Sequence, residues 1–114
     1  MKIAIASGKG KTWDSVMDPR FGRTEYFFIL NEDNNEVKII DNSEANQEAH
    51  GAGPKAAQKL YEEKINILIT GNGPGGNALS VLEKAGTKIY VGAGNMTVRE
   101  AYEAYKSNQL NNFE

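Results

Sequence analysis

A glycine-rich loop, Gly71-Asn-Gly-Pro-Gly-Gly76, carries the spacing G-x-G-x-x-G. It follows the apolar run Ile65-Asn-Ile-Leu-Ile69, which predicts a buried strand, and it precedes an expected helix. Glycines at such a turn let an anion approach the main-chain N–H groups at a helix N-terminus. A dinucleotide site also needs a carboxylate about twenty residues later for the ribose, but Val91-Gly-Ala93 ends the next strand. The loop therefore indicates a tight turn or an anion or cluster site, and it disfavours a dinucleotide site.

The segment Asp18-Pro-Arg20-Phe-Gly-Arg23 stands shortly before an expected strand. Its two arginines can present guanidinium groups to an anion, while the aromatic ring between them packs into the core. The simpler alternative is that one arginine forms a salt bridge with a nearby acid. We expect a functional role for this segment.

The only histidine lies in a third loop, His50-Gly-Ala-Gly-Pro54, directly before an expected helix. An imidazole in this place can ligate iron or zinc at one open position, but it cannot form a closed metal site alone. The alternative is a capping or surface histidine. The sequence leaves both interpretations open.

Several catalytic classes lack the residues they need. Gly10-Lys-Thr12 resembles the end of a P-loop, but the glycine required five positions earlier is replaced by Ile5. A serine nucleophile would have to rely on His50 as its one base, and nothing in the spacing requires such a pair. The first expected strand, Lys2-Ile-Ala-Ile-Ala6, has no carboxylate to hold the metals of a nuclease. We therefore expect a protein that is not an enzyme.

Length and composition set further limits. The 114 residues suffice for one domain, expected over residues 1–114. A hydrophobic fraction of 39% and a charged fraction of 25% are typical of a folded globular protein. The net charge of −2 gives no general attraction to nucleic acid or to an anionic membrane, and the absence of cysteine excludes thiolate ligands. The N-terminal apolar run is too short for a signal peptide, so we expect a cytoplasmic protein.

Apolar patterning predicts an α/β fold. Strands are expected at 3–6, 26–30, 36–40, 65–69 and 87–91, and helices at about 55–64, 77–85 and 97–106. The residues between 41 and 53 are expected to form a loop. Thr97-Val-Arg-Glu100 matches a capping box at the start of the last helix. A β-hairpin beside a parallel βαβ section predicts a mixed five-stranded sheet covered by three helices.

The loops occur in an order that resembles the dinitrogenase iron–molybdenum cofactor biosynthesis family. The residues that carry this resemblance are Met1-Lys-Ile-Ala-Ile-Ala-Ser7, Arg20-Phe-Gly-Arg23 with Tyr26-Phe27, His50-Gly-Ala-Gly-Pro54, Gly71-Asn-Gly-Pro74, Gly86 and Thr97-Val98. It implies a three-layer, ribonuclease H-like fold without nuclease activity, and the binding or carrying of an iron–sulfur or iron–molybdenum cluster. Members associated with nitrogenase often have a histidine directly before Phe-Gly-Arg, where this chain has Arg20. The resemblance therefore implies His50 as the one remaining candidate for a metal contact.

We thus expect a non-catalytic carrier for a metallocluster, bound as cargo, with cofactor-assembly proteins as partners. The alternatives are a small-anion or nucleotide sensor and a protein-interaction module that use the same loops. His50 is the candidate metal ligand. The candidate cluster-binding residues are Arg20, Phe21, Gly22, Arg23, Gly51, Gly53, Gly71, Asn72 and Gly73.

Overall fold

The computed structural model describes residues 1–46 and 51–113 and shows a mixed sheet with helices on both faces. Within these residues the sheet has six strands in the order β3-β2-β1-β4-β5-β6. The strands are β1 (Lys2–Gly8), β2 (Tyr26–Asn31), β3 (Glu36–Asp41), β4 (Ile67–Ile69), β5 (Lys88–Val91) and β6 (Asn111–Asn112). β1, β4 and β5 are parallel, whereas β2, β3 and β6 run antiparallel to their neighbours.

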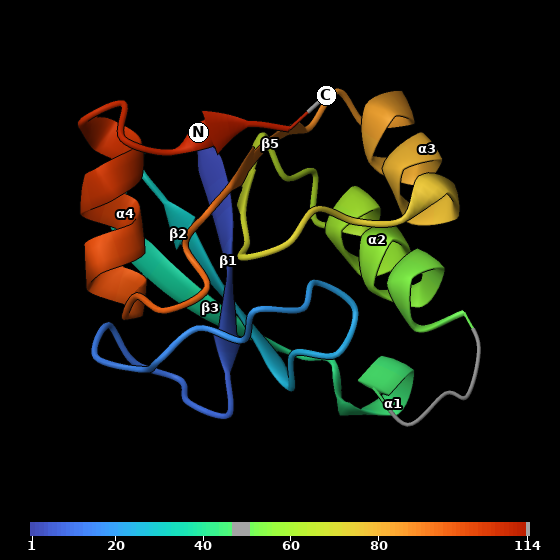
Figure 1. The fold of residues 1–114 in the computed structure, drawn as a ribbon, viewed down its shortest axis with the longest axis horizontal. Helices are drawn as coiled ribbons and strands as arrows, with labels where there is room; N and C mark the ends of the chain where they lie inside the picture. Colours follow the sequence, from blue (N-terminus) through green and yellow to red (C-terminus); the bar gives the residue numbers. More distant parts are fainter. Residues whose placement is uncertain (47–50, 114) are drawn as a thin grey trace.

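Helices cover the two faces of this sheet (Figure 1). α2 (Ala52–Glu62) and α3 (Gly76–Lys84) pack against each other on one face, and α4 (Val98–Lys106) contacts β1 and β4 from the other. A fourth and shorter helix, α1 (Ser43–Asn46), follows β3. No helix in the described part of the chain is long and apolar enough to cross a membrane.

The α/β class, the mixed sheet and the three longer helices are confirmed, but the predicted number of strands is wrong. The sixth strand consists of two asparagines, a residue type that is depleted in strands, so no pattern indicated it.

The helices differ from the prediction in two places. α1 lies in a segment predicted as loop and is too short to show a helical period. α2 begins at Ala52, three residues earlier than expected, because proline is tolerated anywhere in a first helical turn. The ribonuclease H-like assignment stays a prediction.

β1 is the central strand, and its apolar run from Ile3 to Ala6 is completely buried. Strands covered on both faces need continuous apolar sequence, which is why the run does not alternate with polar residues. Because β4 and β5 run parallel to β1, the carboxyl ends of all three strands open at one edge. The loops after these strands therefore emerge together.

The long loop after β1 is held against α4 by main-chain hydrogen bonds. The N–H of Val98 donates to Ser15 O (2.9 Å), and the N–H of Arg99 donates to Trp13 O (2.8 Å). The predicted capping box of Thr97 and Glu100 is confirmed, with both reciprocal hydrogen bonds formed. This end of the loop is fixed, so the following residues enter the site from a defined point.

A polar contact joins α4 to the end of β2. The Tyr102 hydroxyl donates to Glu32 Oε2 (2.5 Å), and Lys106 Nζ lies 3.2 Å from the same oxygen. The hydrogen bond from Tyr102, followed by the hydrogen bond and charge of Lys106, lowers the pKa of Glu32. Burial, with the hydrogen bond to Glu32, raises the pKa of Tyr102 to about 12. Both shifts favour the state in which Glu32 is charged and Tyr102 is neutral.

The Tyr102–Glu32 contact predicts a pH-dependent contribution to stability. A carboxyl whose pKa is lowered by folding stabilises the fold above its unfolded pKa, about 4.3, and loses that effect as the pH falls through the folded pKa. We expect Tyr102→Phe to lower the free energy of unfolding by about 1 kcal/mol at pH 7 and by less at pH 3. Urea unfolding at both pH values measures the difference.

Tyr105→Phe is the matched control, because the Tyr105 hydroxyl makes no hydrogen bond to the described residues although burial raises its pKa. An equal loss for Tyr102→Phe at pH 7 and pH 3 would contradict a charge-assisted bond to Glu32.

Candidate functional site

The three loops singled out in the sequence meet at one pocket of about 400 Å³. Its wall consists of residues 20–23 from the loop after β1, 51–53 at the start of α2, and 72–75 from the loop after β4. Figure 1 shows the loop between β1 and β2 reaching toward the N-terminal end of α2. We call this cavity the arginine pocket, after Arg20 and Arg23.

Most of the predicted site residues lie on the wall of the arginine pocket. Those that do are Arg20, Phe21, Gly22, Arg23, Gly51, Gly53, Asn72 and Gly73. Gly71 is not a wall residue, and His50, the predicted metal ligand, lies outside the described residues. The wall also includes Ala52, Pro74 and Gly75, which the sequence analysis did not single out.

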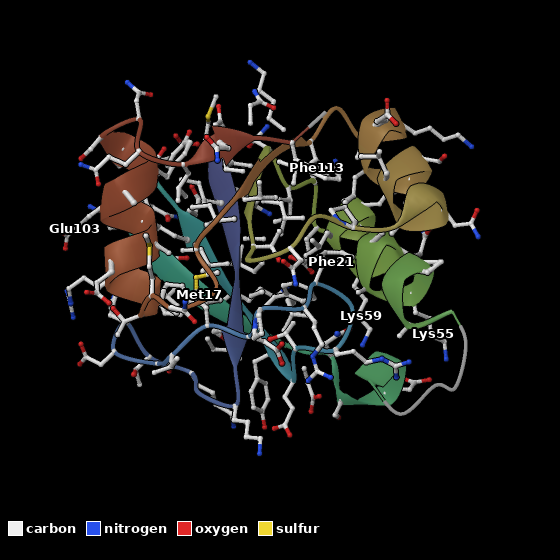
Figure 2. All side chains as sticks on the ribbon, viewed as in Figure 1. Met17, Phe21, Lys55, Lys59, Glu103 and Phe113 are labelled. Carbon is white, nitrogen blue, oxygen red and sulfur yellow. The ribbon has the colours of Figure 1, made fainter. Side chains whose placement is uncertain are left out.

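The two arginines stand on either side of a buried aromatic ring. Phe21, labelled in Figure 2, is 3% exposed. It packs against Phe27, with 5.7 Å between the ring centroids. Arg20 points to solvent, with 63% of its side chain exposed, and its Nε lies 3.3 Å from Asp18 Oδ1. The expected role of Phe21 as the fixed point of this segment is consistent with its burial. The simpler alternative, a salt bridge, is formed by Arg20.

Two helix N-termini also open toward the arginine pocket. α2 begins after Gly51 and α3 after Gly75, and neither helix has a side-chain hydrogen bond at its N-cap. A second hollow of about 340 Å³ adjoins the first and shares Gly51, Gly53 and Gly75 with it. A helix N-terminus carries about half a positive charge and unpaired N–H donors, so both ends favour an anion.

The glycines of the site divide into two groups by what occupies the space of the missing side chain. A Cβ on Gly22 would lie 2.8 Å from the nitrogen of Gly53, and one on Gly73 would lie 2.2 Å from the ring of Phe113. A Cβ on Gly71 would lie 2.7 Å from the Cα of Pro19. By contrast, no atom of the described residues lies within 4 Å of a Cβ placed on Gly51, Gly75 or Gly76. The first group is therefore required by packing, and the second leaves its main chain accessible.

Asn42, which was not among the residues predicted from the sequence, fixes the loop that carries Arg20 and Arg23 through hydrogen bonds. Its side chain is fully buried, and its Nδ2 donates to Gly22 O (3.3 Å) and Thr24 O (2.9 Å). Its main-chain N–H donates to Glu25 O (2.7 Å). An asparagine directly after a strand is a common turn residue, so only the structure reveals these contacts.

No three histidine, cysteine, aspartate or glutamate side chains gather as a possible metal site within residues 1–46 and 51–113. A larger hollow of about 510 Å³ lies at the opposite end of α2 and α3, between Tyr61, Lys64 and Lys84. It contains none of the predicted site residues and no glycine. The arginine pocket differs from it in combining two arginines with the N-termini of two helices.

Known proteins are similar to this chain in fold and in sequence. The structure is similar to the apo form of the orange protein from Desulfovibrio gigas, with a TM-score of 0.89 and 31% identity over 98% of this chain and 92% of that one. It is also similar to a provisionally named NifB protein of the DUF35 family from Thermotoga, with a TM-score of 0.82 and 36% identity over 97% and 91% of the two chains.

Sequence comparison agrees with the structural comparison. An uncharacterised protein of Methanocaldococcus jannaschii, MJ0580, is 31% identical over 118 aligned positions, which cover 100% of this chain and 92% of that protein. The family model described as dinitrogenase iron-molybdenum cofactor matches residues 1–108. The resemblance noted in the sequence is therefore confirmed, and the chain belongs to the dinitrogenase iron-molybdenum cofactor family.

Proposed function

We propose that this protein binds a preformed, anionic iron–sulfur or iron–molybdenum cluster in the arginine pocket and carries it as cargo, without catalysing a reaction. The observation that carries the proposal is the meeting of an arginine-bearing loop with the N-termini of two helices at one cavity. Membership of a family described by the iron–molybdenum cofactor supports a cluster as the anion.

The donor set of the pocket suits an anion whose charge is spread over several atoms. The guanidinium groups of Arg20 and Arg23 offer forked N–H donors, and the helix ends offer main-chain N–H groups. The sulfides of a cluster form such a dispersed anionic surface. Because the whole chain carries a net charge of −2, attraction must come from this local group of donors.

The residues of the chain also fit temporary rather than permanent binding. The sequence has no cysteine, so no thiolate can bond to cluster iron. A cluster would be held by ionic hydrogen bonds, together with His50 as the one proposed metal contact. Such a cluster can leave when a partner with stronger ligands takes it, which is what a carrier in cofactor assembly requires.

The glycine contacts weaken the case for a nucleotide in this pocket. A pyrophosphate approaches its loop where glycines leave the main chain open. Here Pro19 fills the space beside Gly71, and Phe113 fills the space beside Gly73. Gly51 at the start of α2, and Gly75 and Gly76 at the start of α3, have no described atom in that space, and an anion can reach them without a dinucleotide fold.

The first prediction concerns the charge of the arginine pocket. Anaerobic titration with isolated iron–molybdenum cofactor, and with a thiolate-ligated iron–sulfur cubane, should show saturable binding by absorbance. Arg20→Gln should weaken binding by about threefold to tenfold, since it removes one charged donor from an exposed position. The dependence of affinity on salt should fall with it.

Lys84→Gln gives the same change in net charge at the opposite end of α3 and should leave the affinity unchanged. If the two variants lose affinity equally, binding depends on overall charge and not on this pocket. If neither cluster binds to the unmodified protein, the carrier proposal is wrong, and calorimetry with nucleotides and small anions becomes the next measurement.

The second prediction concerns His50. If its imidazole bonds to cluster metal, His50→Ala should weaken binding by about tenfold and shift the absorbance of the bound cluster, because a ligand to the metal changes. A bound spectrum and an affinity that are the same in His50→Ala and in the unmodified protein would show that His50 is no ligand.

A further inference from the structure

We infer that Phe113 positions the glycine loop (residues 71–76) and thereby sets the affinity of the arginine pocket for its ligand. The expected effect on affinity rests on the proposed function, whereas the contact between Phe113 and the glycine loop does not depend on a ligand. Phe113 lies outside the region 1–108 matched by the family model.

The C-terminal segment is attached to the edge of the sheet. Asn112 and Asn111 of β6 pair with Tyr90 and Val91 of β5, and the N–H of Phe113 donates to Ile89 O (2.8 Å). These bonds bring Phe113 to the side of α3 (Figure 2). There it lines a hollow together with Leu79 of that helix. The position of the ring is therefore set by the sheet.

The ring occupies the volume that a side chain at position 73 would need. A Cβ on Gly73 would lie 2.2 Å from Cε1, 2.4 Å from Cζ and 2.5 Å from Cδ1 of Phe113. Gly73 is also a wall residue of the arginine pocket, so the same residue contacts the ring and borders the cavity. A shift of the ring would change the shape of that wall.

Hydrogen bonds hold the start of the glycine loop, but packing holds its middle. The N–H of Asn72 donates to Pro19 O (2.7 Å), and the N–H of Gly92 donates to Gly71 O (3.0 Å). Neither the N–H of Gly73 nor that of Gly75 donates to any of the described residues, and Pro74 has no N–H. The carbonyl oxygens on either side accept from Thr70 Oγ1 (at Asn72, 3.2 Å) and from the N–H of Leu79 (at Gly75, 2.8 Å), so the Phe113 ring is the support of Gly73 between them.

The test is a double-mutant cycle between Gly73 and Phe113. Phe113→Ala should weaken cluster binding by about fivefold, because the loop loses its support. Gly73→Ala should weaken it as well, since the new methyl group displaces the ring. In the double variant the methyl group has room, so the two losses should not add.

A readout without ligand decides the positioning role by itself. Phe113→Ala should speed amide hydrogen exchange by about tenfold at Asn72 and Gly92, whose N–H groups form the hydrogen bonds at the start of the glycine loop, whereas Phe113→Tyr should keep slow exchange and affinity. Leu110→Ala is the matched control, because Leu110 packs from the same segment against the core. It should leave exchange in the loop unchanged. All variants are compared at a temperature well below their unfolding midpoints.

The outcomes separate the two proposals. Unchanged exchange at Asn72 and Gly92 in Phe113→Ala, or additive losses in the cycle, would overturn the positioning role. Faster exchange together with no cluster binding by the unmodified protein would uphold the contact and refute the carrier function instead.

Discussion

The main chains of three loops touch one another, and the shape of the site follows from this. A Cβ on Gly71 would lie 2.7 Å from the Cα of Pro19 and 2.8 Å from that of Gly94. A Cβ on Gly22 would lie 2.9 Å from the Cα of Gly53 at the start of α2. These atoms belong to main chain, which cannot rotate away as a side chain can. One added methyl group would therefore separate the loops after β1, β4 and β5.

This contact between loops also explains the electrostatics of the site. It brings the arginine-bearing segment and the ends of α2 and α3 to one cavity, although the chain as a whole is slightly acidic. Arg20 already pairs with Asp18, and 63% of its own side chain is exposed, against 14% for Asp18. Asp18 Oδ1 also accepts a hydrogen bond from the main-chain N–H of Arg20 (2.8 Å). The guanidinium group can therefore turn to an anionic ligand while Asp18 keeps this hydrogen bond.

Sequence patterns predicted the parts of the fold that depend on burial. The apolar run of β1, the capping box at Thr97 and the helix after the glycine-rich loop are each encoded within a few residues. The short β6 could not be predicted, because two asparagines form a strand only when the edge of β5 lies beside them. The contacts of Asn42 with Gly22 and Thr24 depend on the hairpin as a whole, and no local signal encodes them.

The site illustrates why a glycine pattern alone is ambiguous. The pattern G-x-G-x-x-G shows only that side chains are absent at three positions. It does not show whether a ligand or another part of the protein fills the space that those side chains would occupy. For Gly71 and Gly73 the protein fills it, through Pro19 and Phe113. Gly76, the third glycine of the pattern, has open space beside it among the described residues. The same holds for Gly51 and Gly75, which lie outside the spaced positions and stand at the N-caps of α2 and α3. Gly51 has φ of 82°, a left-handed conformation that favours glycine, so its identity follows from the start of α2 and needs no ligand. Accessible N–H groups in this pocket are consequently a product of how the two helices begin.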